Sequence, residues 1–205
     1  MVKKYDLIIL CAGDFPTHNI PLSILENAQR VLCCDSAAEQ YIKSTGKSPW
    51  RIIGDCDSLS KEFQERYKDI LIHLSEQENN DQTKSVLFAK EEGFRQIAIL
   101  GATGKREDHT LGNISLLMDY FEMGMDVTMF TDYGRFMPCS GDCSFDFPIN
   151  TKVSIFNFGA KNMSSEGLEF KLYDINKLWQ GTLNRVIHSP FTIKAEGNYL
   201  VFINY

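Results

Sequence analysis

The segment that constrains the fold most strongly is Arg51-Ile52-Ile53-Gly54-Asp55-Cys56-Asp57-Ser58-Leu59. A short apolar run ends at Gly54, and the carboxylates Asp55 and Asp57 follow it. Side chains two residues apart in an extended segment point to the same side, about 6.5–7 Å apart along the chain. Where the chain bends over a strand end, as Gly54 permits, two such carboxylates can converge on one hard cation such as Mg²⁺. The spacing fits equally an acidic turn in which Ser58 caps the next helix.

The first 130 residues repeat this alternation of a short apolar run, a polar loop and a helix-forming segment. The expected strands are 7–13, 30–34, 51–54, 70–74, 96–100 and 126–130, and the expected helices are 21–27, 36–42, 61–67, 83–92 and 110–123. Continuous apolar runs are typical of strands that are buried on both faces. The alternation predicts an α/β fold with a doubly wound, mostly parallel sheet of Rossmann-like type.

The pattern changes after about residue 135, where helical periodicity fades. Short β-type runs stand between glycines, asparagines and prolines, at 152–158, 167–173, 185–187, 191–194 and 199–203. Several short strands separated by turn signals predict a small antiparallel β-sandwich or barrel. We therefore expect two domains, an α/β domain over residues 1–136 and a β-sandwich over residues 137–205.

Composition narrows the class of protein. With 43% hydrophobic and 23% charged residues, the 205-residue chain has the balance of a globular protein. Its net charge of −6 argues against nucleic-acid binding, which usually needs a basic face. No apolar stretch approaches the length of a membrane span. The six cysteines include no C-x-x-C pair, so we expect reduced thiols and a cytoplasmic location.

Polar side chains follow most of the predicted strands. They are Asp14, Asp35, Asp55 with Asp57, Asp81, and the loop 103–109, which contains Lys105 and Arg106. Ligands of open parallel sheets bind at the carboxyl ends of strands, so these groups are expected to line one site. Carboxylates for a divalent cation beside basic groups for phosphates indicate phosphoryl transfer. The sequence contains neither a Walker A motif nor G-x-G-x-x-G, and the glycine loop alone equally fits an ordinary strand–helix turn.

Four segments together resemble the motifs of the thiamine pyrophosphokinase family. Gly54-Asp55-Cys56-Asp57-Ser58 is similar to G-D-x-D-S, and Asn80-Asp81-Gln82-Thr83-Lys84 is similar to T-D-x-x-K. Residues 101–109 resemble G-x-x-G-G-R-x-D-H, and residues 34–38 resemble D-G-G-A-N more loosely. The resemblance implies a homodimer with its site near the interface. It also implies transfer of a pyrophosphoryl group from ATP to the hydroxyl of thiamine, giving thiamine diphosphate and AMP.

The resemblance also implies roles for individual residues. The Mg²⁺ ligands would be Asp55, Asp57 and Asp81, which form the catalytic group together with Arg106 and Asp108. The nucleotide contacts would be Asp35, Lys84, Gly101, Thr103, Gly104 and Arg106. The thiamine contacts would be Gln77, Asp108, Phe170 and Asn184. For Phe170 two interpretations stay open: its ring stacks on thiamine, or it is a core residue of the sandwich.

Three positions depart from the family pattern. Asn80 replaces a threonine, Lys105 the second glycine of the loop, and Leu183 a serine expected to bind the substrate. The last departure keeps a second hypothesis open, a Mg²⁺-dependent kinase or pyrophosphokinase for another small heteroaromatic alcohol. A third hypothesis is a regulator that binds nucleotide or thiamine without turnover.

Overall fold

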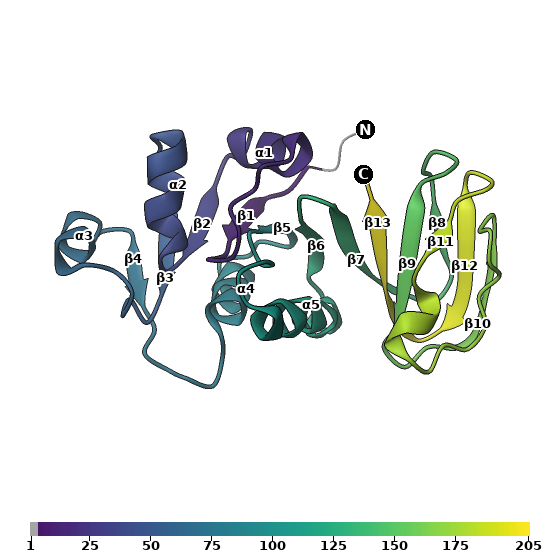
Figure 1. The fold of residues 1–205 in the computed structure, drawn as a ribbon. Coiled ribbons are helices and arrows are strands. Elements are labelled where there is room, and N and C mark those ends of the chain that lie inside the picture. Colours follow the sequence, from purple (N-terminus) through teal and green to yellow (C-terminus); the bar gives the residue numbers. More distant parts are fainter. Residues whose placement is uncertain (1–3) are drawn as a thin grey trace.

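The computed structural model describes residues 4–205, which form two β-sheets and five α-helices (Figure 1). The first part contains β1 (Leu7–Leu10), α1 (Asn19–Glu26), β2 (Val31–Cys34), α2 (Ala37–Thr45), β3 (Arg51–Gly54), α3 (Lys61–Arg66), β4 (Leu71–His73), α4 (Asp81–Glu91), β5 (Gln96–Leu100), α5 (Glu107–Glu122) and β6 (Asp126–Phe130). The second part contains β7 (Gly134–Ser140), β8 (Cys143–Phe145), β9 (Lys152–Asn157), β10 (Lys161–Glu166), the 3₁₀ helix η1 (Leu178–Gly181), β11 (Asn184–Arg185), β12 (Phe191–Glu196) and β13 (Asn198–Asn204).

The parallel part of the large sheet has the strand order β4-β3-β2-β1-β5-β6. Every neighbouring pair in it is parallel. The chain builds outwards from β1 in one direction as far as β4 and then returns to place β5 on the other side of β1. This arrangement confirms the predicted doubly wound sheet, and its switch point between β1 and β5 is where such sheets form a ligand crevice.

Helices cover both faces of this parallel part, and the alternation of β1 side chains explains why. Ile9 packs with Val86 of α4 and Leu117 of α5, whereas Ile8 packs in a second core with Leu25 of α1. In Figure 1, α1 and α2 lie above the sheet and α4 and α5 below it. Apolar side chains are therefore needed on both faces, which is why these strands read as continuous hydrophobic runs.

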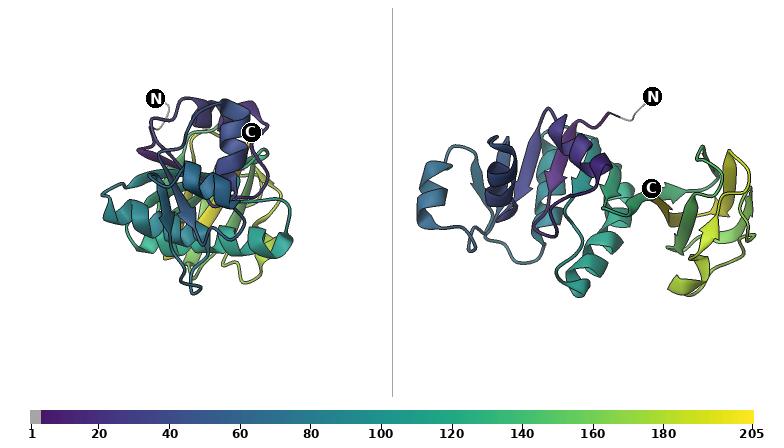
Figure 2. Two further views of the ribbon diagram at one scale, coloured as in Figure 1. Left: turned by 90° about the vertical axis from the view of Figure 1, so that its left-hand side faces the viewer. Right: turned by 45° about the horizontal axis from the view of Figure 1, so that its top comes forward.

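The large sheet continues into the second part of the chain. β7 pairs antiparallel with β6 on one side and with β13 on the other, and β9 and β11 follow. The separate sheet β10-β12-β8 packs over these strands, with Ile193 and Phe191 in one core with Ile155 and Val201. Figure 2 shows the resulting antiparallel sandwich at the end of the molecule opposite α3. The expected fold class is confirmed, and the boundary between residues 136 and 137, which lies within β7, stays a prediction.

Some sequence-based expectations were wrong in detail. The segment 167–173 is not a strand: only Leu168 makes an isolated bridge, to Val186, because the chain turns at Gly167 with φ +83°. Ser58 does not cap α3; the cap is Ser60, whose hydroxyl accepts from the Phe63 amide. No helix within residues 4–205 is both long and apolar enough to cross a bilayer.

Candidate active site

A cleft of about 380 Å³ lies at the carboxyl ends of β1, β2 and β3, beside the loop that follows β5. It therefore occupies the switch point of the sheet. Six residues expected from the sequence line it: Asp55, Gln77, Asp81, Lys84, Gly104 and Arg106. Gly101 and Thr103 line a neighbouring cavity of about 130 Å³ that shares Gly104 with the cleft. The remaining expected residues are outside the cleft lining: Asp35, Asp57, Asp108, Phe170 and Asn184.

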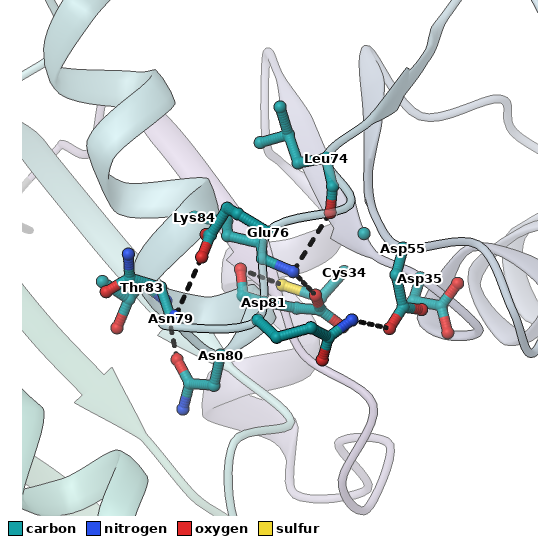
Figure 3. Close-up of polar contacts among 12 residues, drawn as sticks. Cys34, Asp35, Asp55, Leu74, Glu76, Asn79, Asn80, Asp81, Thr83 and Lys84 are labelled. Atoms are coloured by element: carbon teal, nitrogen blue, oxygen red, sulfur yellow. Dashed lines mark hydrogen bonds and ion pairs between the residues drawn. The ribbon is translucent and has the colours of Figure 1, made fainter.

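The turn after β3 brings the first carboxylates into place. The sequence suggested that Gly54 makes the bend, but the residue with a left-handed backbone in this turn is Cys56, with φ +62°. Gly54 is needed for another reason, since a Cβ on it would lie 2.9 Å from the Cβ of Asp35 on the neighbouring strand end. The absence of a side chain lets the ends of β2 and β3 approach, so that Asp35 and Asp55 lie close together (Figure 3).

Asp55 is held as an ionised, partly exposed carboxylate. Its Oδ1 accepts from the backbone N–H of Asp57 over 3.2 Å, and its Oδ2 accepts from Nε2 of Gln77 over 3.4 Å. The hydrogen bond from Asp57 is the main cause that lowers the pKa of Asp55, and the bond from Gln77 lowers it further. Asp57 itself is exposed. The cleft thus holds one charged carboxylate, that of Asp55, and the exposed Asp57 follows it on the same turn.

The start of α4 supplies a third carboxylate and a cation. Asn80 caps this helix by accepting from the Thr83 amide over 2.9 Å. Lys84 is buried, and its Nζ lies 3.5 Å from Oδ1 of Asp81 and 3.2 Å from the carbonyl of Leu74 (Figure 3).

The negative charges of neighbouring carboxylates affect the pKa values of groups in the site. Burial raises the pKa of Asp81, the Lys84 ammonium opposes this, and the charges of Asp35 and Asp55 raise the pKa further. Desolvation and the same group of acids, beginning with Asp35, raise the pKa of the Cys56 thiol to about 11. Asp35 and Asp55, at the ends of β2 and β3, and Asp81, at the start of α4, therefore form one electronegative region.

Asp35 carries an unusual buried atom. Only 8% of the residue is exposed, its Oδ2 accepts from the Ser58 hydroxyl, and its Oδ1 is buried with no hydrogen-bond partner among residues 4–205. A buried carboxylate oxygen without a donor is costly, and such an atom is typical of a site that a cation or water completes.

The donor chemistry of this region fits a hard divalent cation, although in residues 4–205 no three acidic, cysteine or histidine side chains are arranged to hold one. Mg²⁺ commonly takes one or two carboxylates, with waters and substrate phosphates completing its shell. A closed cluster of three side chains is therefore not required of a Mg²⁺ site.

The glycine-rich loop after β5 lies against the chain that leaves β1. The Gly13 amide donates to the carbonyl of Gly101 over 2.7 Å, and the Asp14 amide donates to the carbonyl of Thr103 over 2.8 Å. Gly104 has φ +83°, and a Cβ on it would lie 1.9 Å from Oδ2 of Asp14. Any other residue would be strained in this left-handed conformation and would have to displace the Asp14 side chain, so glycine is strongly favoured there.

Arg106 and Asp108 form a bidentate ion pair at the start of α5. Nε of Arg106 lies 3.1 Å from Oδ1 of Asp108, and Nη2 lies 2.5 Å from Oδ2. The Arg106 guanidinium lowers the pKa of Asp108 to about 2. Both side chains are exposed, and Arg106 lines the cleft.

The two expected residues of the sandwich lie together but away from the cleft lining. Asn184 is buried and holds the backbone of Phe170, donating from Nδ2 to its carbonyl over 2.7 Å and accepting from its amide over 3.1 Å. Phe170 is 62% exposed, so its assignment to the sandwich core is wrong. Trp179 and Leu183 are also exposed.

Sequence reasoning missed a polar network in the lining of the cleft, formed by Asn80, Gln82 and Asn113. Asn113 of α5 donates to the carbonyl of Ala102 over 2.8 Å and accepts from Nδ2 of Asn80 over 2.9 Å. Gln82 donates to the Asn113 carbonyl and to the Tyr120 hydroxyl. The available signal was Asn113 itself, a polar residue among the glycine and the apolar residues of Leu111-Gly112-Asn113-Ile114.

The chain is similar to known proteins along almost its whole length. The family model described as thiamin pyrophosphokinase, catalytic domain, matches residues 22–129, and the model described as thiamin pyrophosphokinase, substrate-binding domain, matches residues 134–202. Thiamin pyrophosphokinase 1 of Caenorhabditis elegans is 27% identical in an alignment that covers 88% of this chain and 81% of the relative.

Solved structures of the same family share the fold. Thiamine pyrophosphokinase from Bacillus subtilis superposes with a TM-score of 0.77 at 21% identity, covering 97% of this chain and 98% of that one. The Candida albicans enzyme gives a TM-score of 0.74 at 18% identity, covering 97% and 89%. Since the catalytic-domain model alone matches more than half of the chain, the chain belongs to the thiamin pyrophosphokinase family.

Proposed function

We propose that the chain transfers the pyrophosphoryl group of ATP to the hydroxyl of thiamine and releases AMP. The hydroxyl oxygen of thiamine bonds to the β-phosphorus of ATP. The bond from that phosphorus to the oxygen bridging the α- and β-phosphates breaks, this oxygen leaves with AMP, and the hydroxyl proton is released. The observation that carries the proposal is the cleft at the switch point, where acidic strand ends face Lys84 and Arg106.

We propose that Asp55, Asp57 and Asp81 hold Mg²⁺ against the triphosphate. The lowered pKa of Asp55 supports this, because the carboxylate stays charged at neutral pH. The unpartnered Oδ1 of Asp35 supports a further contact to the metal or to its waters. When bound, Mg²⁺ would neutralise phosphate charge and orient the reacting oxygens.

Around the phosphates, the protein's own groups would supply position and charge. Lys84 and Arg106 would contact phosphate oxygens, which lowers the cost of negative charge developing during transfer. The loop with Gly101, Thr103 and Gly104 lets phosphates approach the backbone. Asp108 would orient the Arg106 guanidinium through the bidentate pair.

On the thiamine side, we propose that a second copy of the chain completes the site. Phe170 is exposed on a backbone held by Asn184, as a stacking surface for a cationic heteroaromatic ring requires. Phe170 does not line the cleft of its own chain, which supports a homodimer in which the partner brings this ring to the site. The exposed Trp179 and Leu183 give such an interface apolar surface. The free thiols, five of them buried, support a reducing cytoplasmic location.

The test is product analysis with ATP, Mg²⁺ and thiamine. We expect AMP and thiamine diphosphate in equal amounts. AMP formed in the absence of thiamine would indicate hydrolysis, and turnover only with another heteroaromatic alcohol would change the acceptor. ATP binding without any AMP would identify a regulator.

A matched pair of variants tests the site itself. Asp55→Asn should lower turnover at least ~100-fold without unfolding the chain, because the charge is lost while the amide oxygen can still accept from Asp57. The substitution also removes the exposed hydrogen bond that Asp55 accepts from Gln77. Asp69→Asn, on an exposed residue outside the cleft lining, should leave turnover unchanged. Wild-type activity in Asp55→Asn would refute the assignment of the metal ligand.

A further inference from the structure

Three positively charged side chains line the cleft, those of Lys84, Lys105 and Arg106, and they differ in the groups they are paired with. Lys84 is paired with Asp81, and Arg106 is paired with Asp108. Lys105 forms no ion pair with any residue in the described range 4–205, and its Nζ donates over 2.8 Å to a backbone carbonyl, that of Ala12. An anion that binds Lys84 or Arg106 must share that cation with a carboxylate. An anion that binds Lys105 has only to replace the neutral carbonyl oxygen of Ala12 as the acceptor.

The backbone at Lys105 adds a second observation. Lys105 has φ +60°, a left-handed conformation that is unfavourable for a side chain with a Cβ, and it follows Gly104, which is also left-handed. Glycine would satisfy the turn at lower cost. The fold of the loop therefore gives no reason for a lysine at this position, and a reason must be sought in what its ammonium contacts.

Lys105 also stands between two cavities. Together with Ala12 it lines both the cleft and a cavity of about 600 Å³ beside the start of α2, which Ser36 and Lys43 also line. Its exposed, flexible side chain can move its charge along this boundary without disturbing buried groups.

We propose that Lys105 is a further nucleotide-binding residue, whose ammonium leaves the Ala12 carbonyl and binds the phosphate chain of ATP. The exchange replaces a bond to a neutral oxygen with a charge-assisted one, and it leaves no carboxylate without its partner. Lys105 gives the cleft one positive charge beyond Lys84 and Arg106. This inference rests on the proposed function only in naming ATP as the ligand.

The experiment measures the dissociation constant of ATP in the presence of Mg²⁺ and the absence of thiamine, by calorimetry. Lys105→Gly removes the charge and keeps a residue that favours the left-handed turn. It should weaken ATP binding about tenfold at low salt, the effect of one lost charge-assisted hydrogen bond. The loss should shrink at high salt, because exposed charges are screened. Lys105→Arg should restore the affinity to within about twofold, since the charge is kept.

Two controls separate this role from a structural or general electrostatic one. Lys43→Ala removes another exposed lysine, one that lines the neighbouring cavity but not the cleft, and should not change ATP affinity. The unfolding midpoint of Lys105→Gly should be equal to or above that of the wild type.

Wild-type affinity for ATP in Lys105→Gly would overturn the proposal, as would an equal loss in Lys43→Ala. Because binding is measured without an acceptor, the result does not depend on turnover. A wild-type chain that binds ATP through Lys105 but makes no thiamine diphosphate would refute the proposed function alone.

Discussion

Asn80 and Asn113 join the two helices that flank the cleft: Nδ2 of Asn80 donates to Oδ1 of Asn113 over 2.9 Å. Asn80 is also the cap of α4, so it fixes the turn that carries Asp81. Asn113 in turn donates to the carbonyl of Ala102, at the start of the glycine-rich loop. The pair therefore sets the position of Asp81 relative to the glycine-rich loop.

Removing this link should affect both stability and turnover. Asn113→Ala leaves the Ala102 carbonyl and the Asn80 amide without their partner, which should lower the free energy of unfolding by about 1–3 kcal/mol. The chain that still folds should turn over more slowly. Ser115→Ala, on the same helix and exposed, is the control for urea denaturation and for kcat. Equal effects of the two substitutions would contradict a positioning role for Asn113.

Substitutions at two glycines with left-handed backbones, Gly104 and Gly93, can distinguish the energetic cost of the backbone conformation from the cost of a steric clash. A Cβ on Gly104 would lie 1.9 Å from Asp14, whereas a Cβ on Gly93, with φ +86°, meets nothing within 4 Å. We expect each alanine substitution to lower the free energy of unfolding by about 1–2 kcal/mol, because alanine is strained in the left-handed conformation. Gly104→Ala should in addition raise the KM for ATP by displacing the loop. An unchanged KM for ATP in a folded Gly104→Ala chain would contradict a nucleotide-binding role for the loop.

The raised pKa of Asp81 predicts a trade between stability and function. Because its pKa in the fold exceeds the unfolded value of about 4, the charged form destabilises the metal-free chain above the folded pKa. This penalty falls as the pH is lowered through the folded pKa. In urea denaturation without Mg²⁺, Asp81→Asn should be more stable than wild type at pH 7. The difference should shrink as the pH approaches 4. A less stable Asp81→Asn chain at pH 7 would contradict this account.

Phe170 should affect one substrate and not the other. With most of its ring exposed, Phe170→Ala should cost little stability but raise the KM for thiamine about tenfold, the loss expected for a cation–π contact. The KM for ATP should not change. Phe170→Tyr keeps a ring and should behave as wild type. Equal changes in both KM values would argue against stacking.

Much of the fold was predictable because its main strands are buried on both faces. Segments such as 97–100 read as unbroken apolar runs for that reason. β10 was missed because only Met163 and Ser165 of its six residues are buried, and one of these is polar. The motif segments indicated the acids that meet at the strand ends. The order of the strands in the sheet brings these acids together, and this order could not be predicted from the sequence alone.

The parts of the site that sequence could not reveal depend on contacts between distant segments. Nothing near Gly54 shows that its missing Cβ makes room for Asp35. The bond between Asn80 and Asn113 joins positions 33 residues apart, so only the packing of α4 against α5 creates it. The exposure of Phe170 likewise follows from how Asn184 holds its backbone.

Pyrophosphoryl transfer is tested most directly with ATP that carries a radioactive γ-phosphate. In the presence of thiamine and Mg²⁺, the label should appear in thiamine diphosphate, with unlabelled AMP in equal amount, because the β- and γ-phosphates move as one unit. Labelled thiamine monophosphate together with ADP, or label released only as inorganic phosphate, would contradict the account.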